Sequence, residues 1–300
     1  MYSYNAYNQN ITSQIKLPLK SLTNEGFKTN KKIQLHLGSI PNNIIGDKFL
    51  GSTSYFIEND TIYVDAPSIA RYFVKNKSDV VVEPYLDSDE TLIGLFFVHL
   101  VMVFIVKEKD QLLFHGSALT LPASSASCIL LGSKGAGKST LAAALTKLGC
   151  KVLCDDLIQV IQGPVVQPGI PIIKLFKDSY KAITKKEDVE NVQFDGQGKI
   201  HVQVNHTIQP SSLRTICIIE KKDISKIEIK EITGGQKLQN IIPHIIKISQ
   251  IDTDVSVFRQ LLTYSNSIRV FHLIRPEGFT DPHFTANIIL KKITEGEIVI

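Results

Sequence analysis

The chain has 300 residues, of which 43% are hydrophobic and 21% charged, and its formal net charge is +4 at pH 7. This composition is typical of a soluble globular protein with a sizeable core, and the charge is too small to indicate a nucleic-acid partner. The chain has no tryptophan, and no aromatic-rich platform for stacking bases is visible. We therefore expect no nucleic acid among its partners.

The first 108 residues predict a strand-rich N-terminal α+β domain. Apolar alternation and turn residues predict strands within the first twenty residues and over 33–37, 55–57, 61–64 and 79–82. A short helix is expected over 69–74. The apolar run Leu92–Val106 follows the capping residues Asp87–Glu90 and is shorter than the roughly 20 residues of a membrane span. We interpret it as a buried core helix and expect no membrane partner.

Residues 109–300 predict a second domain in which strands and helices are mixed. Strand patterns occur over 126–131, 151–154, 214–219, 226–232 and 268–274. Helical patterns cover 139–148, 236–265 and 284–293, although Pro243 must start or break a helix. The stretch Asn191–Lys199, which contains two glycines, is the best candidate for a loop.

The four cysteines, Cys128, Cys150, Cys154 and Cys217, have no zinc-binding spacing, and three of them lie in apolar strand-like runs. Their pattern favours buried, reduced thiols in a cytoplasmic protein. The first residues lack the basic and apolar regions of a signal peptide, which supports the same expectation.

A complete phosphate-binding loop (P-loop) is the strongest motif of the chain. It consists of Gly132, Ser133, Lys134, Gly135, Ala136, Gly137, Lys138, Ser139 and Thr140. It fits G-x-x-x-x-G-K-[ST] and lies between an expected strand and an expected helix, where its backbone N–H groups can converge on phosphate oxygens. ATP and Mg²⁺ are therefore the expected cofactors: Lys138 should reach the β- and γ-phosphates, and Ser139 should bind Mg²⁺.

Two adjacent acids, Asp155 and Asp156, follow the strand that comes after the P-loop helix. A strand–helix–strand unit of this length predicts a parallel pair with a right-handed crossover, so both strands should end at one edge of the sheet. One of the two carboxylates could then face Mg²⁺, directly or through water, and the other the incoming hydroxyl. The alternative is that the pair caps the next turn or faces solvent.

His115 follows an apolar segment and lies seventeen residues before Gly132. The strand that carries it could return beside the P-loop strand and end at the same site. A lone histidine is more often a packed or surface residue, so its residue type alone does not assign it a role.

Three segments together resemble the C-terminal catalytic domain of the HPr kinase/phosphorylase family: Phe114–Ala118, the P-loop, and Gly149 through Asp156. Asp156 lies eighteen residues after Lys138, where the family has its catalytic aspartate. The N-terminal segment Tyr4–Leu19 and the segment Pro168–Phe176 resemble segments of HPr-kinase-like enzymes that are encoded in ribosomal peptide clusters, notably lasso-peptide kinases.

The resemblance implies an α/β fold, a P-loop kinase domain of the HPr kinase and phosphoenolpyruvate carboxykinase-like type behind a strand-rich N-terminal domain. It implies an ATP-dependent kinase acting on a serine of a peptide or protein, here a ribosomally made lasso precursor. By position, Asp156 would be the base, Lys138 and His115 would serve the phosphate site, and Ser139 and Asp155 the metal. Because HPr kinases assemble as hexamers, a homo-oligomer is also implied.

The chain departs from the family in two features, a metal-binding glutamate and the Gly- and Ile-rich signature stretch that follows it, which is missing here. Residues 174–180 stand where a metal-binding glutamate is expected and contain none; Asp178 is the substitute that the segment offers. These departures argue against reverse phosphorolysis and against HPr as the substrate, and they leave forward transfer standing. Two other functions remain open from the residues: a nucleotide-gated peptide-binding module, and a kinase for free serine or another small molecule.

Overall fold

The computed structural model describes residues 1–19, 31–108, 110–170, 172–185, 198–248, 254–278 and 280–295. The chain divides into two compact units, an N-terminal unit over Met1–Glu108 and a C-terminal unit over Lys109–Ile300. The stretch predicted as a loop, Asn191–Lys199, lies outside the described residues as far as residue 197.

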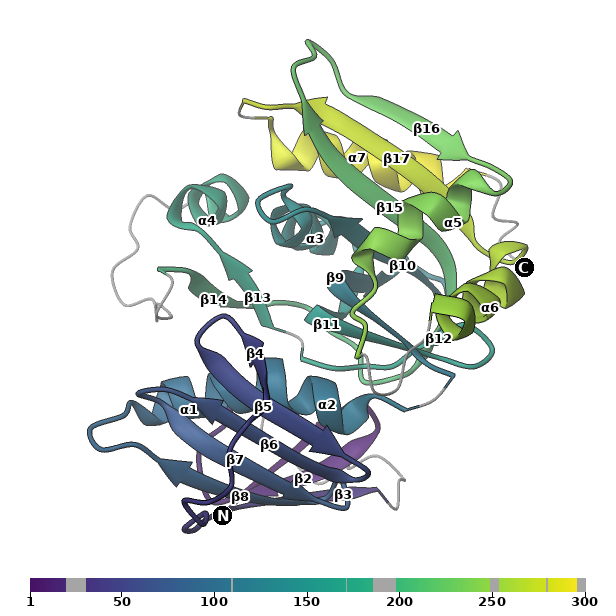
Figure 1. The fold of residues 1–300 in the computed structure, drawn as a ribbon. Coiled ribbons are helices and arrows are strands. Elements are labelled where there is room, and N and C mark those ends of the chain that lie inside the picture. Colours follow the sequence, from purple (N-terminus) through teal and green to yellow (C-terminus); the bar gives the residue numbers. More distant parts are fainter. Residues whose placement is uncertain are drawn as a thin grey trace. The chain divides into compact units, whose positions relative to one another are not determined.

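The N-terminal unit is built on an eight-stranded sheet with the order β1-β2-β3-β8-β7-β6-β5-β4 (Figure 1). Strand β3 runs parallel to both β2 and β8, and the other neighbouring strands are antiparallel. The strands are β1 (Tyr2–Ala6), β2 (Gln9–Ser13), β3 (Lys32–Leu37), β4 (Lys48–Leu50), β5 (Thr53–Glu58), β6 (Thr61–Ala66), β7 (Ala70–Lys75) and β8 (Asp79–Pro84).

The predicted core helix of this unit is confirmed. It consists of α1 (Glu90–Phe96), a π-helical turn (Phe97–Val101) and α2 (Met102–Val106), and Asp89 caps it by accepting a hydrogen bond from the backbone of Thr91 at 2.7 Å. The helix packs on the sheet: the Tyr72 hydroxyl of β7 donates to the Ile93 carbonyl oxygen at 2.7 Å. Among the described residues, no helix is both long and apolar enough to cross a membrane.

The helix predicted over 69–74 is wrong, because this segment forms strand β7. Ala70, Tyr72 and Val74 are buried and alternate with more exposed residues, which is the period of a strand rather than of a helix. Strand β7 also pairs on both sides, with β6 and β8. The segment is too short for its hydrophobic periodicity to distinguish a helix from a strand, and pairing with β6 and β8 determines its conformation.

The C-terminal unit contains a seven-stranded sheet with the order β10-β9-β11-β12-β15-β17-β16, and a two-stranded antiparallel sheet of β13 and β14. Strand β10 also pairs in parallel with β15, so that β10, β9, β11, β12 and β15 form a closed ring of pairings. The strands are β9 (Leu112–Thr120), β10 (Ala126–Gly132), β11 (Lys151–Ile161), β12 (Val165–Val166), β13 (Ile172–Leu175), β14 (Ile200–Gln203), β15 (Ser211–Lys222), β16 (Glu228–Ile232) and β17 (Arg269–Pro276).

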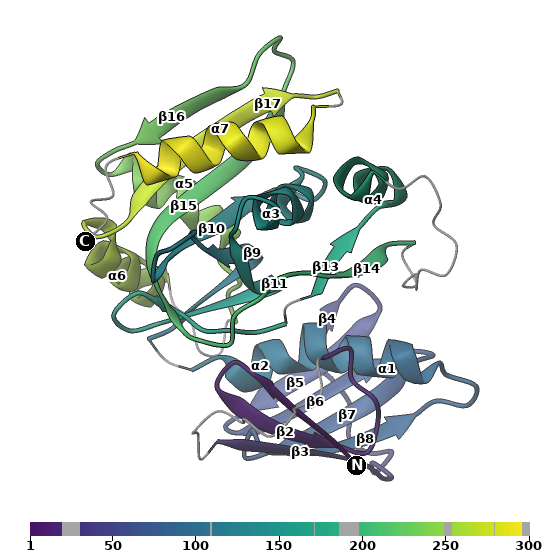
Figure 2. The same cartoon turned by 180° about the vertical axis from the view of Figure 1, so that it is seen from behind.

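Helices cover both faces of this sheet (Figures 1 and 2). Alternate residues of β10, β15 and β17, such as Leu130, Ile219 and Leu273, pack with α3 and α7, and the residues between them pack with α5 and α6. Pro243 lies in a 3₁₀ turn (Ile242–His244) that ends α5, so the helix predicted over 236–265 is interrupted there. The helices are α3 (Lys138–Thr146), α4 (Lys177–Thr184), α5 (Gln236–Ile241), α6 (Asp254–Ser265) and α7 (Pro282–Thr294).

The strands on either side of the P-loop helix are not direct neighbours, which corrects one prediction. Strand β9 lies between β10 and β11 and runs antiparallel to both, so β10 and β11 share a direction without pairing. The acids are also not at a strand end, because β11 continues from Lys151 to Ile161. Strands β10 and β11 do not pair because β9 pairs with both of them, and the other side of β10 pairs in parallel with β15.

Candidate active site

The P-loop joins the end of β10 to the start of α3, as the sequence predicts. At two positions of the loop the structure requires glycine. A Cβ at Gly132 would meet the Ile219 carbonyl oxygen at 2.4 Å, so β15 approaches the loop too closely for a side chain. Gly137 caps α3 with a φ of 103°, a left-handed conformation that favours glycine. The loop therefore presents its backbone at the N-terminus of a helix, where anions bind.

Lys138 is buried and lies along the loop that precedes it. Its ammonium donates to the carbonyl oxygens of Gly132 at 2.9 Å and Ser133 at 3.1 Å. Burial lowers the pKa of Lys138, and the charges of Asp155 and Asp156 oppose this shift. The lysine is thus held by the start of the P-loop and is near enough to the acid pair to interact with both carboxylates.

Asp155 joins the P-loop to the neighbouring strands. Its carboxylate is buried and accepts hydrogen bonds from the Ser117 hydroxyl of β9 at 2.5 Å and from the Ser139 hydroxyl of α3 at 3.2 Å. Burial, followed by the charge of Asp156, raises the pKa of Asp155 to about 7, although both serine hydrogen bonds oppose the shift. The predicted proximity of Asp155 to Ser139 is therefore present, and Ser117 is a partner that the sequence analysis did not identify.

The carboxylate of Asp156 pairs with a charged side chain, whereas that of Asp155 accepts from two hydroxyls and from the backbone of Lys174. Oδ2 of Asp156 lies 2.9 Å from the ammonium of Lys174 on β13, in an ion pair whose side chains are 26% and 12% exposed. The backbone of Asp156 has a φ of 69°, a left-handed conformation that costs an L-residue of the order of 1 kcal/mol. Because successive side chains of a strand point to opposite faces, the two adjacent acids of β11 can have different surroundings.

His115 lies on β9 opposite Leu157, next to the pair formed by Gly116 and Asp156. Its side chain is exposed, yet the protein around the ring lowers its pKa by removing solvent, and the charge of Asp156 opposes that effect. Lys138 also acts on its pKa. The structure thus brings His115, Lys138, Asp155 and Asp156 to one site on three elements.

Three P-loop residues, Ala136, Gly137 and Thr140, lie near α4 and the end of β17. The Thr140 hydroxyl lies 3.0 Å from that of Ser179 on α4. Arg275, at the end of β17, donates from Nε to the Ala136 carbonyl oxygen at 3.0 Å. Asp178 lines a cavity beside Gly137 and Thr140, whereas the position nearest Asp156 is taken by Lys174.

Lys174 and Arg275 were not identified from the sequence. Lys174 falls in Pro168–Phe176, a segment already noted in the sequence, and this is the signal that could have indicated it. Arg275 contacts a residue 139 positions away, and no local pattern indicates such a contact.

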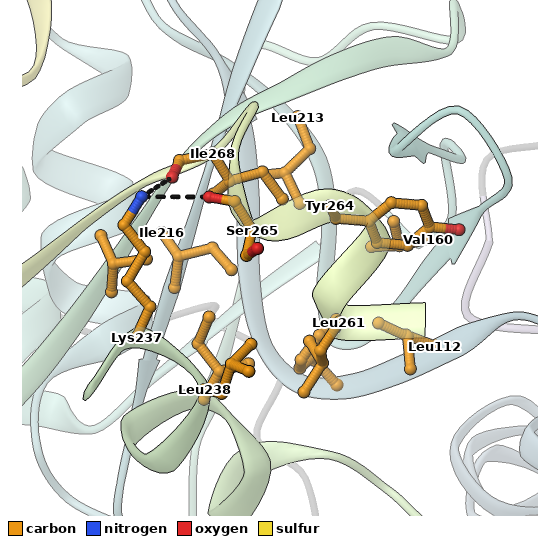
Figure 3. Close-up of a pocket in the computed structure, with 13 residues that line it drawn as sticks. Leu112, Val160, Leu213, Ile216, Lys237, Leu238, Leu261, Tyr264, Ser265 and Ile268 are labelled. Carbon is orange, nitrogen blue, oxygen red and sulfur yellow. Dashed lines mark hydrogen bonds between the residues drawn. The ribbon is translucent and has the colours of Figure 1, made fainter. Parts of the chain in front are cut away.

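Another cavity of this unit, between α5, α6 and the sheet, is not a candidate site (Figure 3). Its volume is about 10 Å³ and its lining is mostly aliphatic. The ammonium of Lys237 donates to the carbonyl oxygens of Ser265, the last residue of α6, at 3.0 Å and of Ile268 at 2.8 Å. A void of this size holds at most one water molecule, so this cavity is a packing defect of the core.

No protein-family profile matches the chain, and no curated protein matches its sequence. Among solved structures, the chain is similar to the Hpr(Ser) kinase/phosphatase from Coxiella burnetii, with 15% sequence identity and a TM-score of 0.30. The match covers 61% of this chain and 94% of that chain. A likeness of this degree carries no conclusion about activity, which has to be inferred from the residues of the site.

Proposed function

We propose that this protein is an ATP-dependent kinase that transfers the γ-phosphate of ATP to a serine hydroxyl of a peptide or protein. One observation carries the proposal: the Ser139 hydroxyl of the P-loop lies 3.2 Å from the carboxylate of Asp155, and the next residue provides a second, separately held carboxylate. A phosphate cradle beside two acids with different surroundings is what phosphoryl transfer to a hydroxyl requires.

The residues present fit Mg²⁺ and a triphosphate. Hydroxyl and carboxylate oxygens, supplemented by water, are the ligands that Mg²⁺ takes in nucleotide sites, and Ser139 and Asp155 would provide them. Lys138 would bind the β- and γ-phosphates from the end of the loop. When bound, Mg²⁺ would neutralise part of the charge on the phosphate oxygens and so favour transfer.

Asp156 is proposed as the general base. The serine oxygen attacks the γ-phosphorus, the bond between that phosphorus and the β-phosphate oxygen breaks, and the hydroxyl proton passes to the Asp156 carboxylate. Lys174 would hold this carboxylate in place through the 2.9 Å ion pair. His115, exposed beside Asp156, would contact the transferred group from the strand between β10 and β11.

The acceptor is proposed from the resemblance of Pro168–Phe176 to the lasso-peptide kinases. Lys174, which pairs with the proposed base, is part of this segment. A ribosomally made precursor peptide carrying a serine is therefore the first substrate to test.

The test is incubation with Mg-ATP and the peptide encoded next to the gene, read by mass for a gain of one phosphate group. The same peptide with serine replaced by alanine, free serine, and a folded Lys138→Ala protein are the controls. Wild-type turnover by Lys138→Ala would exclude the P-loop as the active site. Phosphorylation of free serine alone would indicate a small-molecule kinase, and ATP binding without transfer would indicate a nucleotide-gated binding module.

A further inference from the structure

The segment that follows α5 joins the edge of β9. Pro243 lies in the 3₁₀ turn that ends the helix, and Ile245 after the turn is extended, with φ −81° and ψ 129°. Ile245 forms an antiparallel bridge with Phe114 of β9, and the backbone N–H of Ile246 donates to the Leu113 carbonyl oxygen at 2.8 Å. The segment thus pairs with β9 through its backbone over a short stretch.

This segment meets β9 where the P-loop begins. Strand β10 pairs with β9 from Thr120 to Ser117. Strand β11 pairs along the opposite edge of β9, so the bridge to Ile245 lies on the edge that β10 occupies further along. In the register of that edge, the position opposite His115 belongs to Gly132, the first residue of the P-loop. The segment therefore continues the edge from which the P-loop departs.

The bridge places His244 opposite His115 and on the face of α3. Its two members, Phe114 and Ile245, are both buried in the core with α5 and α6. Neighbouring side chains of a strand point to opposite faces, and directly opposed residues of an antiparallel pair share a face. The two histidines therefore face the other side, as does Ser117, whose hydroxyl binds the carboxylate that also accepts from α3.

The charges around His244 are those of an anion site. Its side chain is half-buried, and burial lowers the pKa of His244; the charges of Lys138 and then of His115 lower it further. At His115, the charge of Asp156 opposes the shift. An ammonium and two imidazoles from three separate elements thus lie near one another, and an anion bound among them would offset their mutual repulsion.

We propose that His244 is a second phosphate-binding histidine of this site, which contacts, together with His115, the terminal phosphate that is to be transferred. The inference rests on the proposed function, because it requires a nucleotide on the P-loop. An imidazole N–H can donate a hydrogen bond to a phosphate oxygen. The P-loop and Lys138 would hold this phosphate from α3, and the two histidines would hold it from β9 and from the segment after α5.

The test compares two ligands that differ in the terminal phosphate. Calorimetry measures the binding of Mg-ADP and of the magnesium complex of the β,γ-imido analogue of ATP. His244→Leu removes both ring nitrogens, His244→Gln keeps an N–H donor, and the control Gln239→Leu places the same leucine at an exposed position of α5. We expect His244→Leu to weaken the analogue by roughly tenfold or more and to leave ADP unchanged. His244→Gln should fall between, and Gln239→Leu should behave as wild type.

Unchanged binding of both ligands by His244→Leu, or equal weakening of both, overturns the inference and leaves the P-loop as a nucleotide site. His115→Leu must show the same selective loss for the pair of histidines to stand. Failure of wild type to bind either ligand overturns the proposed function itself, so the two failures are distinguishable. If melting curves show that His244→Leu does not fold, His244→Ala takes its place under the same criterion, because it removes the ring without adding apolar surface.

Discussion

The ammonium of Lys174 lies 2.9 Å from Oδ2 of Asp156 and joins the two-stranded sheet of β13 and β14 to the long strand β11. Asp156 therefore has a cationic partner, while Asp155, its neighbour in sequence, has two hydroxyl partners, Ser117 and Ser139. The two carboxylates differ in surroundings, and this difference is the basis for giving them different roles.

Replacing Lys174 by methionine should lower kcat while leaving KM for ATP nearly unchanged. Without the ammonium the Asp156 carboxylate loses its orientation, and by analogy with partners that orient metal ligands the loss should be roughly 10–100-fold. Lys174→Arg keeps the charge and should recover part of the activity. Steady-state kinetics and melting curves on the three proteins check this: normal kcat with a lower melting temperature in Lys174→Met would mean that the ion pair is structural.

Replacing Asp156 by asparagine should remove transfer and spare ATP binding. Asparagine keeps the shape of the side chain but cannot accept the proton, and a general base is worth roughly 10²–10⁴ in rate. Single-turnover rates and ATP titrations measure the two effects separately. If Asp155→Asn showed this behaviour and Asp156→Asn remained active, the roles of the two acids would be reversed.

Asp155 should make the stability of the nucleotide-free protein depend on pH. Burial raises its pKa from 3.8 to about 7, so the folded state holds the proton more tightly than the unfolded state. Its contribution to stability is then fully present below about pH 4 and is lost as the pH rises through about 7. Asp155→Asn, which has no charge to desolvate, should lack this fall. Melting temperatures from pH 4 to 8 check it, with the exposed Asp178→Asn as control; parallel curves for wild type and Asp155→Asn would contradict it.

Replacing His115 by alanine should lower kcat more than it lowers stability, because the side chain is exposed and little packing is lost. Although the side chain is exposed, the protein around the ring removes part of its solvent and lowers the pKa of His115, so any activity that needs the neutral form should fall on acidification. Initial rates and melting curves on one preparation decide the matter. A large drop in melting temperature with normal specific activity would show that His115 only packs.

The P-loop could be located from the sequence because its glycines, lysine and serine are contiguous and its strand and helix flank it directly. The proximity of Asp155 to Ser139 also followed, since the crossover through α3 brings β11 back in the direction of β10. The order of the strands in the sheet could not be predicted from the sequence. Whether β9 or β11 lies beside β10 depends on long-range pairing, about which the local pattern carries no information.

Contacts between residues that are far apart in the sequence could not be predicted either. Lys174 pairs with an acid eighteen positions earlier, and Arg275 contacts Ala136 across 139 positions. Such contacts arise from packing of whole elements rather than from spacing along one of them. The segment 69–74 failed for a related reason, since its six residues take their strand conformation from β6 and β8.

The closed ring of pairings in the C-terminal unit has a consequence for local opening. Strands β9, β10 and β11 are hydrogen-bonded on both sides, whereas Lys174 belongs to a ribbon of two four-residue strands. Amide hydrogens of β9, of β10 and of the part of β11 that pairs with β9 should therefore exchange with solvent only on global unfolding, and those of β13 and β14 through much smaller fluctuations. The proposed base is carried by the slowly exchanging part and its cationic partner by the rapidly exchanging part, so the two sides of the site can separate without loss of the fold.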